Sequence, residues 1–227
     1  MTSRIGVVQF PGTNCELDVV HAVEQLGASG EILFHTERTL RGVDAVVVPG
    51  GFAHGDYLRT GAIARFSPIM DAVAGLAAAG GPVVGVCNGF QVLCEAGLLP
   101  GALQKNASLK FICQTVELRV ETTASVLTSQ ARKGDVLRVP INHFEGNYVC
   151  SAETLAELRA EDRIVVRYVR NPNGSLDDIA GISNETGNVV GLMPHPERAS
   201  DQILGSTDGV VLLRSLLDAA TARSKVA

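Results

Sequence analysis

The chain has 227 residues, of which 46% are apolar, 19% charged and 4% aromatic, with a formal net charge of −5. This length and apolar content predict a single domain over residues 1–227, built around one large core. The acidic balance and the lack of tryptophan argue against nucleic acid as a partner. Because no apolar run approaches the roughly 20 residues that span a bilayer, we expect no membrane partner and a cytoplasmic location.

The N-terminal half predicts alternating strands and helices. The β-branched apolar runs at 4–10 and 44–51 end in Pro or Gly, as is typical of parallel strands buried on both faces. Between them, Thr13 and Glu16 have the spacing of a capping box, and Gly27 would end the helix that they begin. The apolar stripe expected on this helix consists of Val20, Val23 and Leu26.

A second helix and a further strand follow. The run 67–81 is helical in pattern, with Ser67 as a possible cap and Pro68 suited to the first turn. It leads into a buried strand at 81–87. The face of this helix that we expect to be buried consists of Ile69, Val73 and Leu76.

Beyond residue 110 the sequence changes to short strands joined by polar turns. These runs predict an additional antiparallel strand section in the C-terminal half; they lie at 113–120, 135–141, 163–169, 178–184 and 188–194. A terminal helix is expected at about 208–222. The apolar residues that share one of its faces are Val210, Leu213 and Leu217.

Cys87 stands between two glycines where an apolar strand is expected to end. The pattern Gly85-Val86-Cys87-Asn88-Gly89 has the form of a nucleophile elbow, a sharp strand-to-helix turn that needs small residues two before and two after the nucleophile. At a helix start, unpaired N–H groups and the helix dipole favour the thiolate. The pattern predicts an exposed, reactive Cys87, and its alternative is a buried cysteine beside a tight turn.

His195 and Glu197 supply a base and a group to orient it. Pro196 biases His195 toward extended backbone, in which residues two apart project to the same side. Glu197 could then fix the imidazole, as the third member of a catalytic triad does. Taken alone, the triplet could equally be a solvated loop.

An acyl-transfer site also needs donors for the oxyanion. The N–H of Asn88, just after the nucleophile, is one candidate. Gly51, which ends a strand with no side chain to block an approach, is the other, although a Gly-Gly pair is commonly only a turn.

The motifs resemble those of a known family. "GVCNGFQ" (85–91) and the later His-x-Glu are similar to the Cys-x-Gly-x-Gln and His-x-Glu signatures of the class I, or triad, glutamine amidotransferases. Within that family the chain resembles the glutaminase subunits of phosphoribosylformylglycinamidine synthases, from about residue 5 to residue 215. The stretches that carry this likeness include "VVQFPGTNCELD", "PGGFAHGDYLRTGAIARFSPIM", "NPNGSLDDIAGI", "MPHPERA" and "LGSTDG".

The resemblance implies a flavodoxin-like α/β fold, an open, mostly parallel twisted sheet with helices on both faces. It implies that Cys87 attacks the side-chain amide of glutamine, His195 moves protons, Glu197 supports His195, and Gln91 helps to hold the substrate. The ammonia would pass to a large synthetase subunit, with a small accessory subunit, that converts formylglycinamide ribonucleotide to formylglycinamidine ribonucleotide. No cofactor is expected in this chain, and ATP and Mg²⁺ are expected on the synthetase.

Two places depart from the family pattern. Ala53 and His54 stand where Ser and Tyr are usual, and Asn142 and Phe144 flank His143 where Ala and Gly are usual. These departures leave the contacts to the α-amino and carboxylate groups of glutamine unassigned. His54 and His143 themselves are expected to be surface or packing histidines.

Other patterns are absent from the sequence. The cysteines, at 15, 87, 94, 113 and 150, are odd in number and contain no Cys-x-x-Cys, so we expect them all reduced, and no metal site is indicated. Neither a P-loop nor a Gly-x-Gly-x-x-Gly fingerprint is present. The ATP-dependent half-reaction is therefore expected on another polypeptide, with 53–60 as the segment that contacts it.

Three alternatives stay open at this point. One is a glutaminase subunit for another synthetase. A second is an elbow-cysteine protein of the DJ-1 or intracellular peptidase group, in which His usually follows the cysteine directly, where this chain has Asn88. The third is a scaffold that kept the fold and lost the chemistry, against which the intact Cys87, His195 and Glu197 argue.

Overall fold

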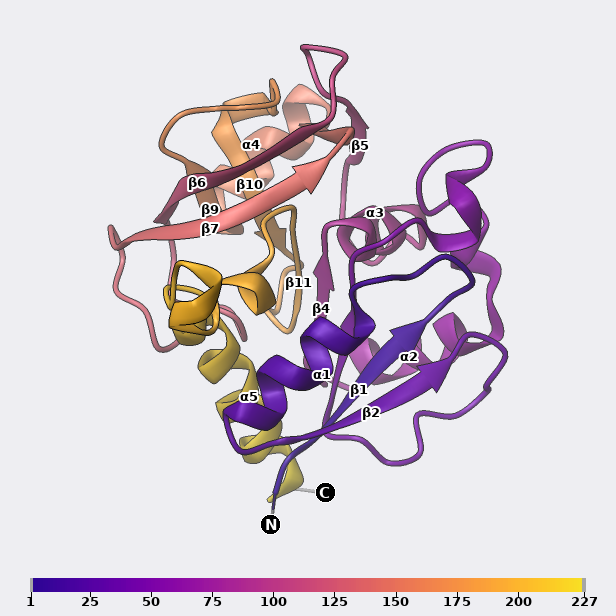
Figure 1. Ribbon diagram of the computed structural model, residues 1–227. Helices are drawn as coiled ribbons and strands as arrows, with labels where there is room; N and C mark the ends of the chain where they lie inside the picture. The colour runs from indigo at the N-terminus through magenta and orange to yellow at the C-terminus, as the bar shows by residue number, and fades with distance from the viewer. Residues whose placement is uncertain (1, 226–227) are drawn as a thin grey trace.

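The computed structural model describes residues 2–225, and a nine-stranded sheet forms its centre (Figure 1). The strand order is β2-β1-β3-β4-β11-β10-β9-β6-β7. The strands of this sheet are β1 (Arg4–Gln9), β2 (Ser29–Phe34), β3 (Ala45–Val48), β4 (Val83–Val86), β6 (Ile112–Val120), β7 (Val136–His143), β9 (Ile164–Tyr168), β10 (Ile179–Ser183) and β11 (Val189–Leu192). A separate antiparallel pair consists of β5 (Ala102–Lys105) and β8 (Glu145–Val149).

Helices connect these strands. The α-helices are α1 (Glu16–Gln25), α2 (Pro68–Ala78), α3 (Asn88–Glu95), α4 (Ala152–Ala160) and α5 (Val210–Ser224). The short 3₁₀ helices are η1 (Ala53–Asp56), η2 (Ala64–Phe66), η3 (Leu176–Asp178), η4 (Pro196–Ala199) and η5 (Gln202–Leu204).

The expected α/β fold is confirmed. Strands β2, β1, β3, β4 and β11 pair in parallel in the doubly wound order, and every residue of β3, β4 and β11 is buried. Helix α1 contacts α5, whereas α2 and α3 both contact η2, so that helices cover both faces of this parallel part (Figure 1).

The antiparallel section is an extension of the same sheet. Strands β10, β9, β6 and β7 continue from β11 through antiparallel pairs. The run at 188–194 was expected among the antiparallel strands, but it forms β11, whose second partner, β4, is parallel to it. This strand therefore joins the two parts and brings the C-terminal half of the chain to the carboxyl end of β4.

The start of α1 differs from the prediction. The Thr13 hydroxyl accepts a hydrogen bond from the Phe10 N–H at 3.0 Å, so Thr13 closes the turn after β1, and Cys15 precedes the helix without a side-chain cap. The buried stripe is Val19, Ala22 and Val23, so that only Val23 of the expected stripe is buried. Packing on β1 and β2 sets this face, which local periodicity could not reveal.

Several strands and one helix were not predicted from the sequence patterns. The edge strand β2 has one fully buried residue, Leu33, so it lacks an alternating pattern, and the first βα unit closes on β2 and not on the run at 44–51. Strands β5 and β8 and helix α4 were also missed.

Two helix details differ as well. Pro68 opens α2 as expected, but the Ser67 hydroxyl contacts the His54 ring and does not cap the helix. The buried face of α5 consists of Leu212, Leu213, Ser215, Leu216 and Ala220, of which only Leu213 was expected. No helix within residues 2–225 has the length and apolar character that crossing a membrane requires.

Candidate active site

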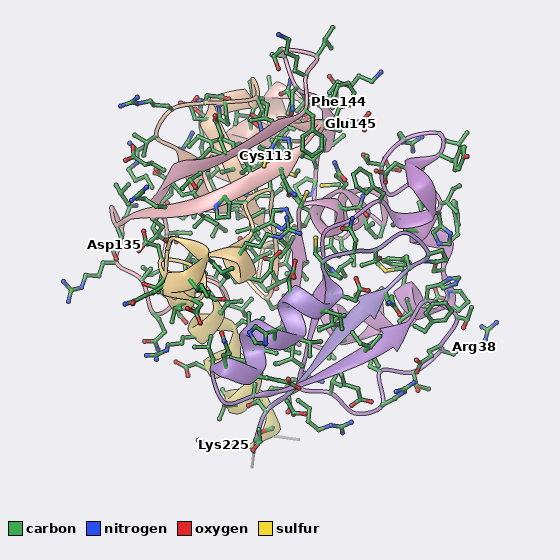
Figure 2. All side chains as sticks on the ribbon, in the orientation of Figure 1. Arg38, Cys113, Asp135, Phe144, Glu145 and Lys225 are labelled. Carbon is green, nitrogen blue, oxygen red and sulfur yellow. The ribbon has the colours of Figure 1, made fainter. Side chains whose placement is uncertain are left out.

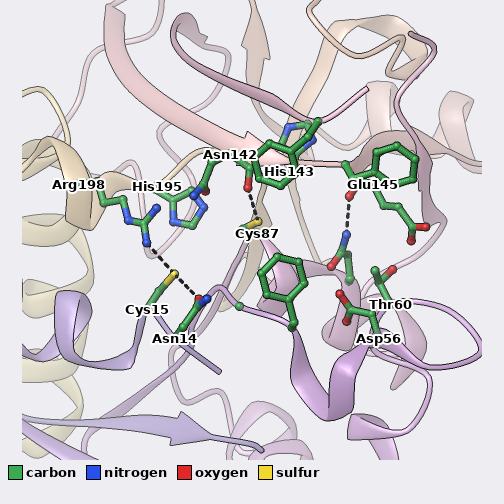
Figure 3. Close-up of a pocket in the computed structure, with 15 residues that line it drawn as sticks. Asn14, Cys15, Asp56, Thr60, Cys87, Asn142, His143, Glu145, His195 and Arg198 are labelled. Atoms are coloured by element: carbon green, nitrogen blue, oxygen red, sulfur yellow. Dashed lines mark hydrogen bonds between the residues drawn. The ribbon is translucent and has the colours of Figure 1, made fainter. Parts of the chain in front are cut away.

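A pocket of about 310 Å³ lies at the carboxyl ends of the parallel strands (Figure 3). Its walls include Cys15 after β1, Gly51 after β3, Cys87 after β4 and His195 after β11, together with the β7–β8 turn at 142–145. Because parallel strands end at a common edge, four segments distant in sequence meet there. Cys87 and His195, the expected nucleophile and base, are thus brought into one cavity.

The backbone at Cys87 has the geometry of the expected elbow. Its φ of 51° and ψ of −107° form a conformation that side chains rarely adopt, and its N–H donates to the Leu192 carbonyl at 2.8 Å. A Cβ at Gly85 would lie 2.7 Å from the Gly89 backbone, and one at Gly89 would overlap the Val48 carbonyl. Both glycines are therefore required by close approach of the backbone.

Cys87 is less exposed than the elbow pattern predicted. The residue is only 6% exposed, and its sulfur lies 3.9 Å from the Asn142 carbonyl, to which the thiol donates. Three aromatic rings, those of Phe52, Phe111 and Phe144, line the cavity that leads to it. Figure 2 shows Phe144 next to Glu145, where β7 of the β6–β7 hairpin ends. This hairpin folds over the elbow from far along the chain, a contact that no local motif encodes.

His195 and Glu197 form a buried pair. The His195 Nδ1–H donates to Glu197 Oε1 at 2.5 Å, and both side chains are 1% exposed. The His195 N–H donates to the Pro140 carbonyl at 2.9 Å, which fixes the residue beside β7. Within residues 2–225 the buried His195 Nε2 has no hydrogen-bond partner. The expected juxtaposition of the two side chains is therefore present, with one imidazole nitrogen free to exchange a proton.

The surroundings make this imidazole more basic. Burial alone would lower the pKa of His195, but the Glu197 carboxylate and the Cys87 sulfur outweigh it and raise the pKa above its ordinary value. A basic imidazole can accept the thiol proton and retain it until a leaving group needs it.

The two candidate oxyanion donors have free N–H groups. Neither the Gly51 nor the Asn88 N–H makes a hydrogen bond within the described part of the chain. Asn88 is the first residue of α3, where helical N–H groups lack intrahelical partners. Gly51 has a φ of 147°, and a Cβ there would lie 2.8 Å from the Thr13 Cα. Their part in catalysis stays a prediction.

The side chains of Asn88 and Gln91 link three walls of the pocket. Asn88 Nδ2 donates to Asp56 Oδ1 at 3.0 Å and to Gln91 Oε1 at 2.9 Å, while its Oδ1 accepts from the Ala53 N–H at 3.0 Å. Gln91 Nε2 donates to the Glu145 carbonyl. Gln91 lines the pocket, but its amide is occupied by protein partners; its role in holding substrate stays a prediction.

Cys15 and Arg198 were not singled out from the sequence. The Arg198 guanidinium donates to the Cys15 sulfur at 3.0 Å and to Asp18 at 3.1 Å. Burial raises the pKa of Cys15 to about 12, although Arg198 opposes the shift, so Cys15 is a neutral thiol beside the triad. Its position after β1, at the carboxyl edge, is the signal that could have identified it.

Within residues 2–225 one set of side chains has the donor atoms for a metal ion. The Cys15 sulfur, a His195 ring nitrogen and a Glu197 oxygen lie within 4.8 Å of one another. His195 and Glu197 are already joined by their own hydrogen bond. The absence of a bound metal stays a prediction.

His143 and His54, the two histidines expected to be surface or packing residues, pack against neighbours. His143 is buried with its Nδ1 3.0 Å from Asn106 Oδ1, and burial, with the nearby His195, lowers its pKa to about 4, so its ring is neutral. The His54 ring lies edge-on to that of His35, with centroids 5.2 Å apart.

The comparisons with known proteins agree on one family. Residues 2–208 match the family described as "CobB/CobQ-like glutamine amidotransferase domain". A protein of Rubrobacter xylanophilus named phosphoribosylformylglycinamidine synthase subunit PurQ is 56% identical over 94% of this chain and 97% of its own length. The protein of the same name from Lacticaseibacillus casei is 54% identical over 95% of both chains.

Solved structures show the same relationship. A chain in the structure of PurLQS from Thermotoga maritima is 42% identical, with a TM-score of 0.89 over 96% of this chain and 99% of its own. A Thermoplasma acidophilum protein described as a GMP synthase subunit is 15% identical, with a TM-score of 0.64 over 100% of this chain and 98% of its own, which indicates a common fold alone.

Proposed function

The chain belongs to the CobB/CobQ-like glutamine amidotransferase family, and from this premise we propose that it is the glutaminase subunit of a phosphoribosylformylglycinamidine synthase. It hydrolyses glutamine, and the synthetase uses the released ammonia to convert formylglycinamide ribonucleotide to formylglycinamidine ribonucleotide in purine biosynthesis. The observation that carries the chemistry is the single pocket in which the strained Cys87 elbow meets the buried His195–Glu197 pair.

The geometry supports a two-step reaction. The Cys87 sulfur attacks the amide carbon of glutamine, and the oxyanion that forms is stabilised by the N–H groups of Gly51 and Asn88. His195 accepts the thiol proton and passes it to the leaving nitrogen, so that ammonia departs and a γ-glutamyl thioester remains. Water, deprotonated by His195, then attacks the thioester, and glutamate leaves with the sulfur reprotonated.

Glu197 acts through His195 in both steps. Its carboxylate holds the Nδ1 proton and so directs Nε2 as the exchanging nitrogen. Its charge also stabilises the imidazolium that exists between proton acceptance and delivery.

The partners form the second half of the proposal. Its support is the high identity to synthase subunits and the likeness to a chain of PurLQS. The proposed complex contains a large synthetase subunit, which binds ATP and Mg²⁺ and amidates the acceptor, and a small accessory subunit. The proposed location is the cytoplasm.

The rim of the pocket supports a docking site. The segment 52–66 exposes several large apolar side chains, with Leu58 90% exposed, and exposed apolar groups that lie together mark interaction surfaces. The exposed large apolar residues of this segment are Phe52, Tyr57, Leu58, Ile63 and Phe66, and of these Phe52 lines the pocket together with the exposed Phe111. His54, Asp56 and Leu58 all have positive φ, a strained arrangement that the Asn88 hydrogen bonds hold in place. The synthetase would contact 53–60 and thereby act on the elbow through Asn88.

This coupling predicts that the isolated chain hydrolyses glutamine slowly. Docking of the synthetase, with acceptor and nucleotide bound, is expected to align the Gly51 and Asn88 donors and raise kcat/KM; one misaligned oxyanion donor costs roughly 10²–10³-fold. The measurement is steady-state glutamate production by the chain alone and during titration with the synthetase, with formylglycinamidine ribonucleotide formation followed in parallel. A high kcat/KM in isolation, unchanged at saturating partner, would refute the gating. Glutamate production without amidation of this acceptor would refute the assignment to this synthase.

A further inference from the structure

Two carboxylates line the pocket, those of Asp56 and Glu145, and both lie away from the Arg198 guanidinium. Figure 3 shows Asp56 and Glu145 on one side of Cys87 and Arg198 on the other. Arg198 is occupied, because it donates to both Asp18 and Cys15. Within residues 2–225 neither Asp56 nor Glu145 forms an ion pair.

Asp56 is a carboxylate with too few partners. In the described part of the chain its one side-chain hydrogen bond comes from Asn88 Nδ2, at 3.0 Å. Burial raises its pKa to about 6, the Asn88 hydrogen bond opposes this shift, and the Glu145 carboxylate adds to it. An ionised carboxylate that is partly removed from water and lacks a cation is stabilised by any cation that enters beside it.

The position of Asp56 suits one end of glutamine. Asn88 follows the nucleophile directly, and its side chain reaches from the elbow to Asp56. Cys87 and Asp56 both line the pocket, so a glutamine with its amide at the Cys87 sulfur can extend its α-ammonium group toward the Asp56 carboxylate.

We infer that the Asp56 carboxylate binds the α-ammonium group of glutamine and so makes a free α-amino group a requirement for hydrolysis. This inference rests on the proposed glutaminase function and adds a specificity-determining residue to it. Asp56 comes from η1, after β3, and the reacting sulfur comes from the end of β4. The two ends of one substrate are therefore held by neighbouring strands of the sheet.

The competing interpretation is that Asp56 only anchors η1 through Asn88. Asp56→Asn separates the two roles, because the amide oxygen can still accept the Asn88 hydrogen bond, whereas the charge is lost. Glu145→Gln is the matched control, since it removes the other carboxylate that lines the pocket without touching the Asn88 contact.

The test compares wild type and two variants on two substrates, and every assay uses the complex with the synthetase. Wild type, Asp56→Asn and Glu145→Gln are assayed for kcat/KM with glutamine and with 4-carbamoylbutanoate, which is glutamine without its α-amino group. With glutamine, Asp56→Asn is expected to lower kcat/KM by roughly 10–100-fold, chiefly through KM, as for loss of a charged hydrogen bond. With 4-carbamoylbutanoate, wild type and Asp56→Asn are expected to be equal. Ammonia-dependent amidation confirms that each complex is assembled.

The outcomes distinguish the two claims. An equal loss for both substrates would show that Asp56 only anchors the loop, and no loss for either would show that it is dispensable; each result overturns the inference. A substrate-selective loss in Glu145→Gln alone would move the ammonium site to Glu145 and also overturn it. If the wild-type complex failed to hydrolyse glutamine, the proposed function would fall, and the inference with it.

Discussion

Cys87→Ala is expected to abolish glutamine-dependent amidation by the complex while ammonia-dependent amidation continues. The nucleophile forms the thioester, and alanine offers no atom that can do so; removal of a triad nucleophile lowers kcat by roughly 10⁴-fold or more. Added ammonium bypasses this step because the acceptor is amidated on another subunit. The measurement is the initial rate of amidation with saturating glutamine and, separately, with ammonium chloride.

A matched variant controls for loss of a thiol. Cys113 lies exposed on β6, outside the pocket lining, and Cys113→Ala is expected to retain both activities. If Cys87→Ala used glutamine at a near-normal rate, Cys87 would have no part in the mechanism.

The second prediction with a large expected effect is that His195→Ala lowers the glutaminase kcat more than Glu197→Gln does. His195→Ala removes the group that carries the proton in both steps. Glu197→Gln keeps an oxygen that can accept from Nδ1, but it removes the charge that raises the pKa of His195. In a triad the orienting acid is worth roughly 10²-fold less than the base. We therefore expect the loss in glutaminase kcat to be larger for His195→Ala by about that factor.

Both side chains are buried, so folding must be checked independently. Ammonia-dependent amidation by each reconstituted complex and the thermal unfolding midpoint of each variant serve this purpose. A larger loss in Glu197→Gln, with both variants folded, would mean that the roles of His195 and Glu197 have been assigned wrongly.

The local geometry around Cys87 and His195 could be predicted from the sequence. The two glycines around Cys87 encode the elbow because the steric demand falls within five residues, and the structure has the strained φ of 51° there. The contact between His195 and Glu197 was also predicted, but from an extended segment, whereas Pro196 and Glu197 begin the 3₁₀ helix η4, which brings the carboxylate to His195 Nδ1.

The enclosure of the site could not be predicted in this way. The β7–β8 turn covers Cys87 from a hairpin far along the chain, so the sulfur that the elbow pattern presents as exposed is buried. Asp56 sits in a short irregular helix whose conformation is held by Asn88, a contact between two separate strand ends. Such residues become recognisable only once the strand order is known.

The predictions of which face of a helix is buried, and of where edge strands lie, failed for a related reason. On α1, Val19 is buried and Val20 less so, because the helix packs on β1 and β2. Strand β2 lies at the edge of the sheet with little burial, and its sequence lacks the apolar run that identified β3 and β4. In both cases tertiary packing, which the local pattern does not contain, decided the result.

The central claim, that glutamine is hydrolysed through a thioester on Cys87, is tested most directly by trapping that intermediate. The complex is quenched with acid during steady-state turnover of glutamine, and the peptide that contains residues 83–97 is analysed by mass spectrometry. We predict a γ-glutamyl group on the Cys87 sulfur, absent without glutamine and absent in Cys87→Ala. A glutamyl group on a different residue, such as Cys15, or sustained hydrolysis by Cys87→Ala with no glutamyl-enzyme formed, would contradict it.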